Sequence, residues 1–288
     1  MANFFDLPVN QTVFFDGAMG TELQKRGLRQ DPAILNLTHG EAIIDIHLKY
    51  LKAGADIITA NTFGAYSHKY SNAADMIKAA MSHGRTALSQ FNGKWKWLAL
   101  DLGPTGLMLE PYGDTTPEEC YKIFEEAVTL GAACGADLIL VETMMDLAEL
   151  ELAVTAAKKT GLSVFATMSF DKNGRTMMGA SLDDMAALLE RLEADALGMN
   201  CGFGPDMYVP LAEKLAGITK LPIIVQPNAG MPVSAEHDPD RPGEYLLAQY
   251  DLSVSDFAQA MAAIDAAVIG GCCGTSPEHI AAITQSPL

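Results

Sequence analysis

The segment Ala266-Ala-Val-Ile-Gly-Gly-Cys-Cys-Gly274 joins a short apolar run to a glycine-rich end that carries two adjacent cysteines. The segment Ala196-Leu-Gly-Met-Asn-Cys-Gly202 follows the same plan, with one cysteine after its apolar run. A short apolar run that stops at turn-forming residues is typical of a buried β-strand. Both segments therefore predict a strand that carries cysteine at its carboxyl end.

Eight such runs recur along the chain, at residues 13–15, 57–60, 97–100, 138–141, 163–168, 196–199, 223–226 and 266–269. Helix-length stretches with one apolar side lie between them, at 42–53, 118–134, 146–159, 182–192 and 254–264. Strands that alternate with helices predict a parallel sheet, and eight units in this length favour a closed (β/α)8 TIM barrel. No G-x-G-x-x-G follows the first run, so the usual support for an open dinucleotide-binding sheet is missing.

The composition limits the classes of partner. The chain has 288 residues, is 49% hydrophobic and carries a formal net charge of −17. Because no linker or low-complexity segment interrupts the repeated units, we expect one barrel domain over residues 1–288. An acidic surface repels nucleic-acid phosphates and anionic lipids, so neither nucleic acid nor membrane is an expected partner.

The amino terminus and the cysteine count indicate a compartment. Residues 1–10 contain neither the basic stretch nor the apolar stretch of a secretory signal. Five cysteines, two of them adjacent, are more typical of metal ligands or catalysts in a reducing compartment than of disulfides. We therefore expect a cytoplasmic protein.

Three of the cysteines point to a metal site. Cys201, Cys272 and Cys273 follow predicted strands, and the carboxyl ends of barrel strands meet at one face. Three thiolates favour Zn²⁺ and leave the fourth tetrahedral position open, as in a catalytic zinc site. Zinc there would deprotonate an incoming thiol. Cys120 and Cys134 fall on predicted helices, where we expect them to pack as small apolar residues.

Two acids at strand ends suggest an amino-acid ligand. Asp16 and Glu142 each end an apolar run, and a buried carboxylate needs a partner in the protein or in a ligand. Pairing with a basic side chain or a backbone amide is one possibility, and binding of a ligand ammonium group is the second. Gly17 begins a glycine-rich turn whose backbone N–H groups, together with Thr62, suit a carboxylate.

One connection is unusually long. Residues 228–253, between the seventh strand and its helix, are rich in Pro, Gly, Asp and Glu. Connections of this length are often lids or binding loops. His237 within it is a candidate lid residue, although a solvated loop is the simpler interpretation.

The motifs together resemble the homocysteine S-methyltransferase family along nearly the whole chain. The matching stretches are Asp16-Gly-Ala-Met-Gly-Thr21, Asn61-Thr-Phe63, Gly103-Pro-Thr105, Val141-Glu-Thr143, Asn200-Cys201, Pro227-Asn-Ala-Gly230 and Gly270-Gly-Cys-Cys-Gly-Thr275 with Pro277-Glu-His279. Within the family, the chain looks most similar to the homocysteine-binding module of cobalamin-dependent methionine synthase.

The resemblance implies a zinc-dependent enzyme that methylates homocysteine to methionine, with zinc on Cys201, Cys272 and Cys273. It implies a homocysteine amino group near Asp16 and Glu142 and a carboxylate near Gly17 and Thr62. It also brings Asn200 into the substrate-binding set. No catalytic residue beyond the metal site is expected.

The methyl donor stays open at this stage. The chain contains no D-x-H-x-x-G cobalamin-binding segment, so we expect a methylated corrinoid on a separate protein. A small-molecule donor such as S-methylmethionine or betaine is also possible, and so is another thiol as acceptor. A non-catalytic zinc site or a vicinal-thiol redox sensor is the last possibility.

Overall fold

The computed structural model describes residues 12–94, 96–236 and 247–285. The amino-terminal stretch 1–10, used above for the compartment, and His237 lie outside the described residues. Within the described part, eight parallel strands form one sheet in the order β1-β10-β7-β6-β5-β4-β3-β2. The strands are β1 (Val13–Phe14), β2 (Ile57–Thr59), β3 (Trp97–Leu102), β4 (Leu138–Met144), β5 (Ser163–Met168), β6 (Ala196–Asn200), β7 (Ile223–Gln226) and β10 (Val268–Ile269).

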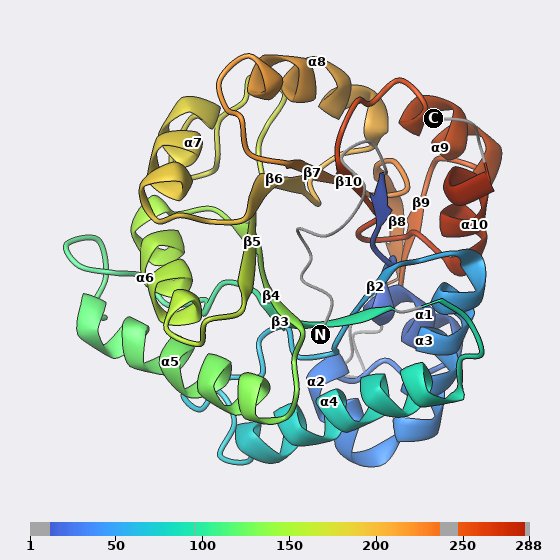
Figure 1. Cartoon of the computed structure of the whole chain (residues 1–288), viewed down its shortest axis with the longest axis horizontal. Helices are drawn as coiled ribbons and strands as arrows, with labels where there is room; N and C mark the ends of the chain where they lie inside the picture. Colours follow the sequence, from blue (N-terminus) through green and yellow to red (C-terminus); the bar gives the residue numbers. More distant parts are fainter. Residues whose placement is uncertain (1–11, 95, 237–246, 286–288) are drawn as a thin grey trace.

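The two ends of the sheet meet, so the strands enclose a barrel (Figure 1). A parallel bridge joins Phe15 to Ile57, and the Asp16 N–H donates to the Ile57 carbonyl at 3.0 Å. The expected (β/α)8 architecture is confirmed, because every predicted run overlaps a barrel strand.

Helices surround the ring of strands (Figure 1). They are α1 (Met19–Lys25), α2 (Pro32–Thr38), α3 (Gly40–Ala53), α4 (Ala73–Gln90), α5 (Pro117–Ala133), α6 (Leu147–Lys158), α7 (Leu182–Arg191), α8 (Pro205–Ala216), α9 (Val254–Met261) and α10 (Pro277–Gln285). Side-chain caps fix where several of them begin. Thr116 and Ser181 each form a reciprocal capping box with the acid three residues later, which satisfies N–H groups that a helix start leaves unpaired.

Alternation along the strands divides the buried apolar side chains into two layers. One set points into the barrel and includes Trp97, Ala99, Leu138, Leu140 and Phe165. The intervening residues, such as Leu98 and Leu100, point outward and pack beneath the helices. Successive strand side chains face opposite ways, so one strand supplies both layers.

The long connection 228–253 is not an irregular loop throughout. Its two arms, β8 (Pro232–Glu236) and β9 (Leu247–Tyr250), pair antiparallel as a separate two-stranded sheet. The sequence pattern did not predict this pairing, because Pro232 and the acidic residues nearby conceal the strand pattern. The residues that join the two arms are outside the described part.

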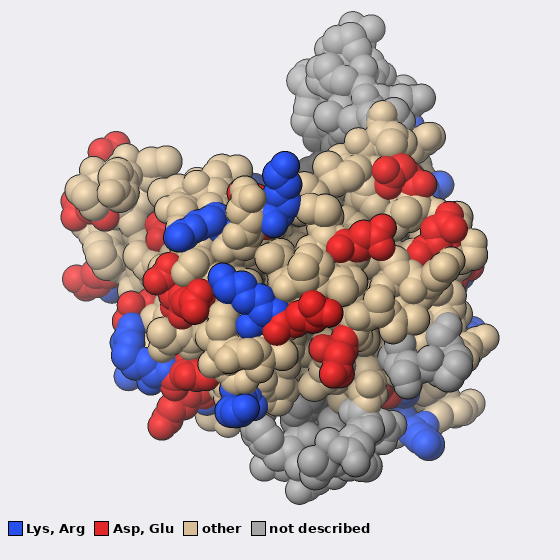
Figure 2. All heavy atoms as spheres, turned by 90° about the horizontal axis from the view of Figure 1, so that it is seen from above, with Lys and Arg blue, Asp and Glu red and all other residues tan. Residues whose placement is uncertain are grey.

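The charged side chains on the surface fit the expectation that the protein does not bind nucleic acid. On the face shown in Figure 2, acidic and basic side chains are interspersed and do not separate into a basic patch. No helix in the described ranges combines the length and apolar character needed to cross a bilayer.

Candidate metal centre and ligand cavity

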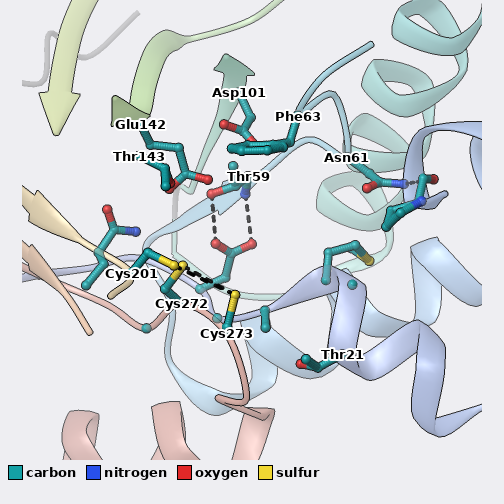
Figure 3. A pocket seen from close by; sticks show the side chains of 18 of the residues that line it. Thr21, Thr59, Asn61, Phe63, Asp101, Glu142, Thr143, Cys201, Cys272 and Cys273 are labelled. Carbon is teal, nitrogen blue, oxygen red and sulfur yellow. Dashed lines mark hydrogen bonds between the residues drawn. The ribbon is translucent and has the colours of Figure 1, made fainter. Parts of the chain in front are cut away.

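A cavity of about 340 Å³ opens at the carboxyl ends of the barrel strands. This volume falls in the range of small-molecule sites. Its walls come from segments far apart in the sequence (Figure 3). The lining comprises residues 16–21, Gln24, Pro32, 59–61, Phe63, Asp101, Glu142, Thr143, Cys201, Gln226, Tyr250 and 271–273.

Three cysteine sulfurs lie together on one wall of this cavity (Figure 3). The Cys273 sulfur is 4.0 Å from that of Cys201 and 4.0 Å from that of Cys272, and all three lie within 4.8 Å of one another. Backbone hydrogen bonds hold the segments that carry them. The Cys201 N–H donates to the Gln226 carbonyl at 3.0 Å, and the Cys272 N–H donates to the Pro227 carbonyl at 2.8 Å.

The turn after β6 has an unusual backbone. Cys201 has a φ of 62° and Gly202 a φ of 68°, so two consecutive residues are left-handed. For a residue with a Cβ this conformation costs about 1–2 kcal/mol. The Tyr208 hydroxyl donates to the Cys201 carbonyl and helps to hold it. Such strain is typical of functional sites, where the surrounding structure fixes a conformation that the local sequence disfavours.

Tyr250 of β9 packs against the segment that follows the paired cysteines. Gly274 has a φ of 81°, and a Cβ there would lie 2.3 Å from the Tyr250 ring. Glycine is therefore required at this position on both grounds. The hairpin arm thus forms part of the cavity wall beside the sulfurs.

The thiols influence one another's ionisation. Hydrogen bonds from the Cys201 and Cys272 thiols, together with one from Tyr250, hold the pKa of Cys273 well below its usual value. The hydrogen bonds of Cys272 with Cys201 and Cys273, together with burial, raise the pKa of Cys272.

The cluster fits a tetrahedral soft metal. Zinc–sulfur bonds of about 2.3 Å at tetrahedral angles place sulfurs about 3.8 Å apart, close to the 4.0 Å separations here. Among the described residues, the metal-competent group contains only these three side chains of the Cys, His, Asp and Glu types. A fourth ligand of these types is therefore not part of the described cluster.

Asp16 lines the same cavity as the three sulfurs. Its two carboxylate oxygens accept hydrogen bonds from the Thr59 N–H and the Thr59 hydroxyl, both at 2.8 Å. Burial raises the pKa of Asp16 to about 7, although these two bonds oppose the shift. Gly17, beside it, also lines the cavity.

Glu142 stands on β4 next to Asn200 of β6. The Asn200 side-chain amide donates to the Glu142 carboxylate at 2.9 Å and to the Thr143 hydroxyl at 2.7 Å. The same nitrogen lies 3.8 Å from the Cys272 sulfur. Burial raises the pKa of Glu142 to about 8, and the nearby charges of Cys201 and Asp16 add to the shift.

Asp101 is a third acid in the cavity, and the sequence motifs did not place it among the substrate-binding residues. Its side chain is 5% exposed, and its Oδ1 atom has no hydrogen-bond partner. Burial, the charges of Glu142 and Asp16 and a side-chain hydrogen bond with Glu142 raise its pKa well above the usual value. Asp101 stands two residues after Ala99, an inward-facing residue of β3, so strand alternation was the signal that could have identified it.

Two of the residues expected to bind substrate do not line the cavity. Asn200 is fully buried and contacts the site through Glu142 and Thr143. Thr62 is 2% exposed and turns toward β3, where its hydroxyl donates to the Asp101 carbonyl at 2.8 Å and accepts from the Asp101 N–H at 3.0 Å. Asn61 and Phe63, on either side of Thr62, line the cavity instead.

The acids have no cationic partner among the residues that the structure describes. None of the ion pairs among the described residues includes Asp16, Asp101 or Glu142. Buried carboxylates without a cation are costly, so the site is electrostatically prepared for a positively charged group. Pairing with a basic side chain finds no support in these residues.

Comparison with known proteins supports the family resemblance that the sequence motifs indicated. The family model for homocysteine S-methyltransferase matches residues 13–286. A methionine synthase from Mycobacterium leprae is 30% identical over 92% of this chain, and one from Mycobacterium tuberculosis is 30% identical over 96%. The chain spans 23% and 25% of the length of these two relatives.

Solved structures support the fold. The apo form of the homocysteine methyltransferase MmuM from Escherichia coli is 25% identical, with a TM-score of 0.74 and 96% of each chain covered. The metallated form of the same enzyme gives a TM-score of 0.77 at 24% identity, with 96% of this chain and 97% of that chain covered.

Proposed function

The chain belongs to the homocysteine S-methyltransferase family, a family of methyltransferases, and from this premise we propose that it transfers a methyl group to the sulfur of homocysteine to give methionine. The observation that carries the proposal is the pairing, within one cavity, of a three-sulfur cluster with acids that have no cationic partner among the described residues. A small molecule with a thiol at one end and an ammonium group at the other matches both features.

We propose that Cys201, Cys272 and Cys273 hold one zinc ion. Three thiolates are a donor set that zinc prefers, and the sulfur separations suit its tetrahedral geometry. The zinc would act as a Lewis acid that lowers the pKa of the acceptor thiol, so that its sulfur is nucleophilic near neutral pH.

The remaining residues orient the acceptor. Asp16 and Glu142 would accept hydrogen bonds from its ammonium group, and both line the cavity that holds the sulfurs. Gly17 and the first residues of α1 line the same cavity, and the N–H groups at a helix start have no partner within the helix. Those N–H groups suit the acceptor carboxylate. Thr62 and Asn200 would act indirectly, because they hold Asp101 and Glu142.

The chain's contribution to the transfer is positional. The acceptor sulfur attacks the methyl carbon, the bond between that carbon and the donor breaks, and the donor keeps the electron pair. Fixing the ammonium and carboxylate groups orients the sulfur toward the cavity mouth, and such orientation removes several kcal/mol from a barrier. The acids remain as hydrogen-bond acceptors and do not exchange protons with the methyl group.

For the donor we propose a methylated corrinoid held outside the barrel. The methionine synthase relatives are about four times longer than this chain, and a bulky donor must approach the cavity from its mouth. Large apolar side chains are exposed on the loops that follow strands β2, β3, β5 and β7, a composition that suits docking of another protein surface. They are Phe63, Leu107, Met108, Tyr112, Met177, Met178 and Met231, and Val233 of β8 is exposed next to Met231.

A donor panel tests this proposal. Zinc-loaded protein and homocysteine would be combined with a methylated corrinoid protein, methyl-folate, S-methylmethionine, betaine or S-adenosylmethionine, and methionine would be measured. We expect turnover with the corrinoid protein. Turnover with S-methylmethionine or betaine alone would instead assign a small-molecule donor, and failure with every donor would reject the methyltransferase proposal.

The same preparation tests a different acceptor and a redox role. Cysteine and glutathione in place of homocysteine show whether another thiol is the acceptor. A redox sensor predicts reversible oxidation of Cys272 and Cys273 without turnover, which mass spectrometry of the oxidised protein would detect. We further propose that residues 1–288 form one domain and that the free thiols belong to the reducing environment of the cytoplasm.

A further inference from the structure

We propose that Asp101 completes, with Asp16 and Glu142, a three-carboxylate cradle that selects a primary ammonium group and discriminates against N-alkylated amines. This inference rests on the proposed function, because it takes an α-amino thiol as the ligand. It adds a specificity-determining residue to that site.

The position of Asp101 follows from β3. Trp97 and Ala99 of this strand face the barrel interior, and Asp101 continues the same alternation one step nearer the cavity. In the strand register Asp101 pairs with Leu140 of β4, which also faces the barrel interior. The Asp101 carboxylate is therefore directed into the cavity that it lines.

The three acids differ in how far the protein satisfies them. Both oxygens of Asp16 accept from Thr59, and Glu142 accepts from Asn200. Asp101 shares a side-chain hydrogen bond with Glu142, while its buried Oδ1 atom has no partner among the described residues. An unsatisfied buried acceptor costs about 1–3 kcal/mol, so Asp101 has the most to gain from a donor on the ligand.

The backbone of Asp101 is held more firmly than a free strand end requires. The Thr62 hydroxyl donates to its carbonyl and accepts from its N–H, which closes the gap between the loop after β2 and β3. Phe63 lies beside Asp101 at the edge of the cavity (Figure 3), and its ring packs so closely on Gly103 that a Cβ there would lie 2.2 Å away. These contacts fix the backbone from which the carboxylate projects before any ligand arrives.

The number of acceptors matches one kind of donor. A primary ammonium group has three N–H bonds, and one can point to each of the three carboxylates that line the cavity. An N-methyl ammonium has two, so one carboxylate would face a methyl group and stay buried without a partner. Sites built to hydrogen-bond a ligand reject analogues that leave a buried polar group unpaired.

Binding of matched ligands to the zinc-loaded protein provides the test. Calorimetry would compare L-homocysteine, N-methyl-L-homocysteine and 4-mercaptobutanoate, which differ only at the amino group. We expect Asp101→Ala to weaken homocysteine binding about 10- to 100-fold, the loss of one hydrogen bond to a charged group. We expect the same variant to leave 4-mercaptobutanoate within about twofold and to lose most of the preference for homocysteine over its N-methyl analogue.

Two further variants keep the test independent of folding. Asp101→Asn keeps one neutral acceptor and should fall between the wild type and Asp101→Ala. Glu149→Gln is the matched control, because Glu149 is also a buried carboxylate but is held by Thr105 away from the cavity, and it should bind homocysteine normally.

The outcomes separate this inference from the proposed function. If the wild type binds and methylates homocysteine while Asp101→Ala keeps the same selectivity among the three ligands, the cradle is wrong and the function stands. If the wild type neither binds nor methylates homocysteine, the proposed function fails and the cradle fails with it.

Discussion

The lower and upper parts of the barrel interior are built from the same strands by the same alternation, yet they have opposite characters. Below, inward side chains such as Leu140, Phe165 and Ile224 form a dry apolar layer. Above, the next inward positions are Asp101, Glu142 and their polar neighbours, which line a cavity.

The difference shows where the chain places its stabilising and its functional residues. The lower layer buries apolar surface, worth about 25 cal/mol for each Å². The upper layer buries acceptors without partners, including Asp101 Oδ1 and Gln226 Oε1, and it includes the left-handed residues Thr143 and Cys201. Such features lower stability unless a ligand satisfies them. The predictions below test this division.

The largest effect is expected in the upper part. Cys272→Ser removes one sulfur from the cluster, so we expect zinc content to fall and methyl transfer to drop about a thousandfold, or about 4 kcal/mol in the barrier. Elemental analysis and a methionine assay measure the two changes. Cys134→Ser is the control, because that cysteine caps helix α5 outside the cavity. Full zinc and full activity in Cys272→Ser would contradict the proposed mechanism.

The next effect belongs to the lower layer. Phe165→Ala removes a fully buried ring that packs edge-to-face on Phe15 with ring centres 6.2 Å apart. We expect the free energy of unfolding in urea to fall by about 3–5 kcal/mol, with zinc bound in the same ratio by the folded protein. A variant that kept its stability but lost zinc would erase the distinction between the two layers.

We expect a buried acid of the upper layer, Asp16, to contribute to the pH dependence of stability. The pKa of Asp16 is raised from 3.8 to about 7 in the folded protein, so the folded state holds a proton that the unfolded state has released. The contribution of Asp16 to stability is therefore fully present below pH 3.8 and is lost as the pH rises through 7.

For ligand-free protein we expect Asp16 to account for a loss of about 2 kcal/mol between pH 5.5 and pH 8. Asp16→Asn should flatten this dependence, and urea unfolding at the two pH values measures it. Equal slopes in the wild type and the variant would show that Asp16 is already ionised in the folded state.

The smallest effect compares backbone strain inside and outside the cavity. Glu193, before β6, has a φ of 54° and lies outside the cavity. Glu193→Gly should raise the free energy of unfolding by about 0.5–1 kcal/mol. Thr143→Gly relieves a φ of 59° but removes the hydroxyl that accepts from Asn200. We therefore expect weaker homocysteine binding from Thr143→Gly, measured by calorimetry, and unchanged binding from Glu193→Gly.

Much of the fold and part of the site could be predicted from local patterns. The apolar runs identified the barrel strands, and the polar residues after them identified the face that holds the cavity. The hairpin of β8 and β9 was missed because its residues lack clear alternation. Thr62, which we expected to bind substrate, does not line the cavity, whereas its neighbours Asn61 and Phe63 do. The reason is that a turn, and not a strand, determines where these three side chains point.

The sequence by itself determined the barrel and the kinds of side chain at its mouth, because strand periodicity and residue chemistry are local properties. Only the tertiary structure decided how those side chains combine. It brought three sulfurs within 4.8 Å of one another, joined Asn200 to Glu142 and left the Oδ1 atom of Asp101 buried without a hydrogen-bond partner. These relations depend on strand register and on the closure of the sheet, which connect residues that the sequence separates.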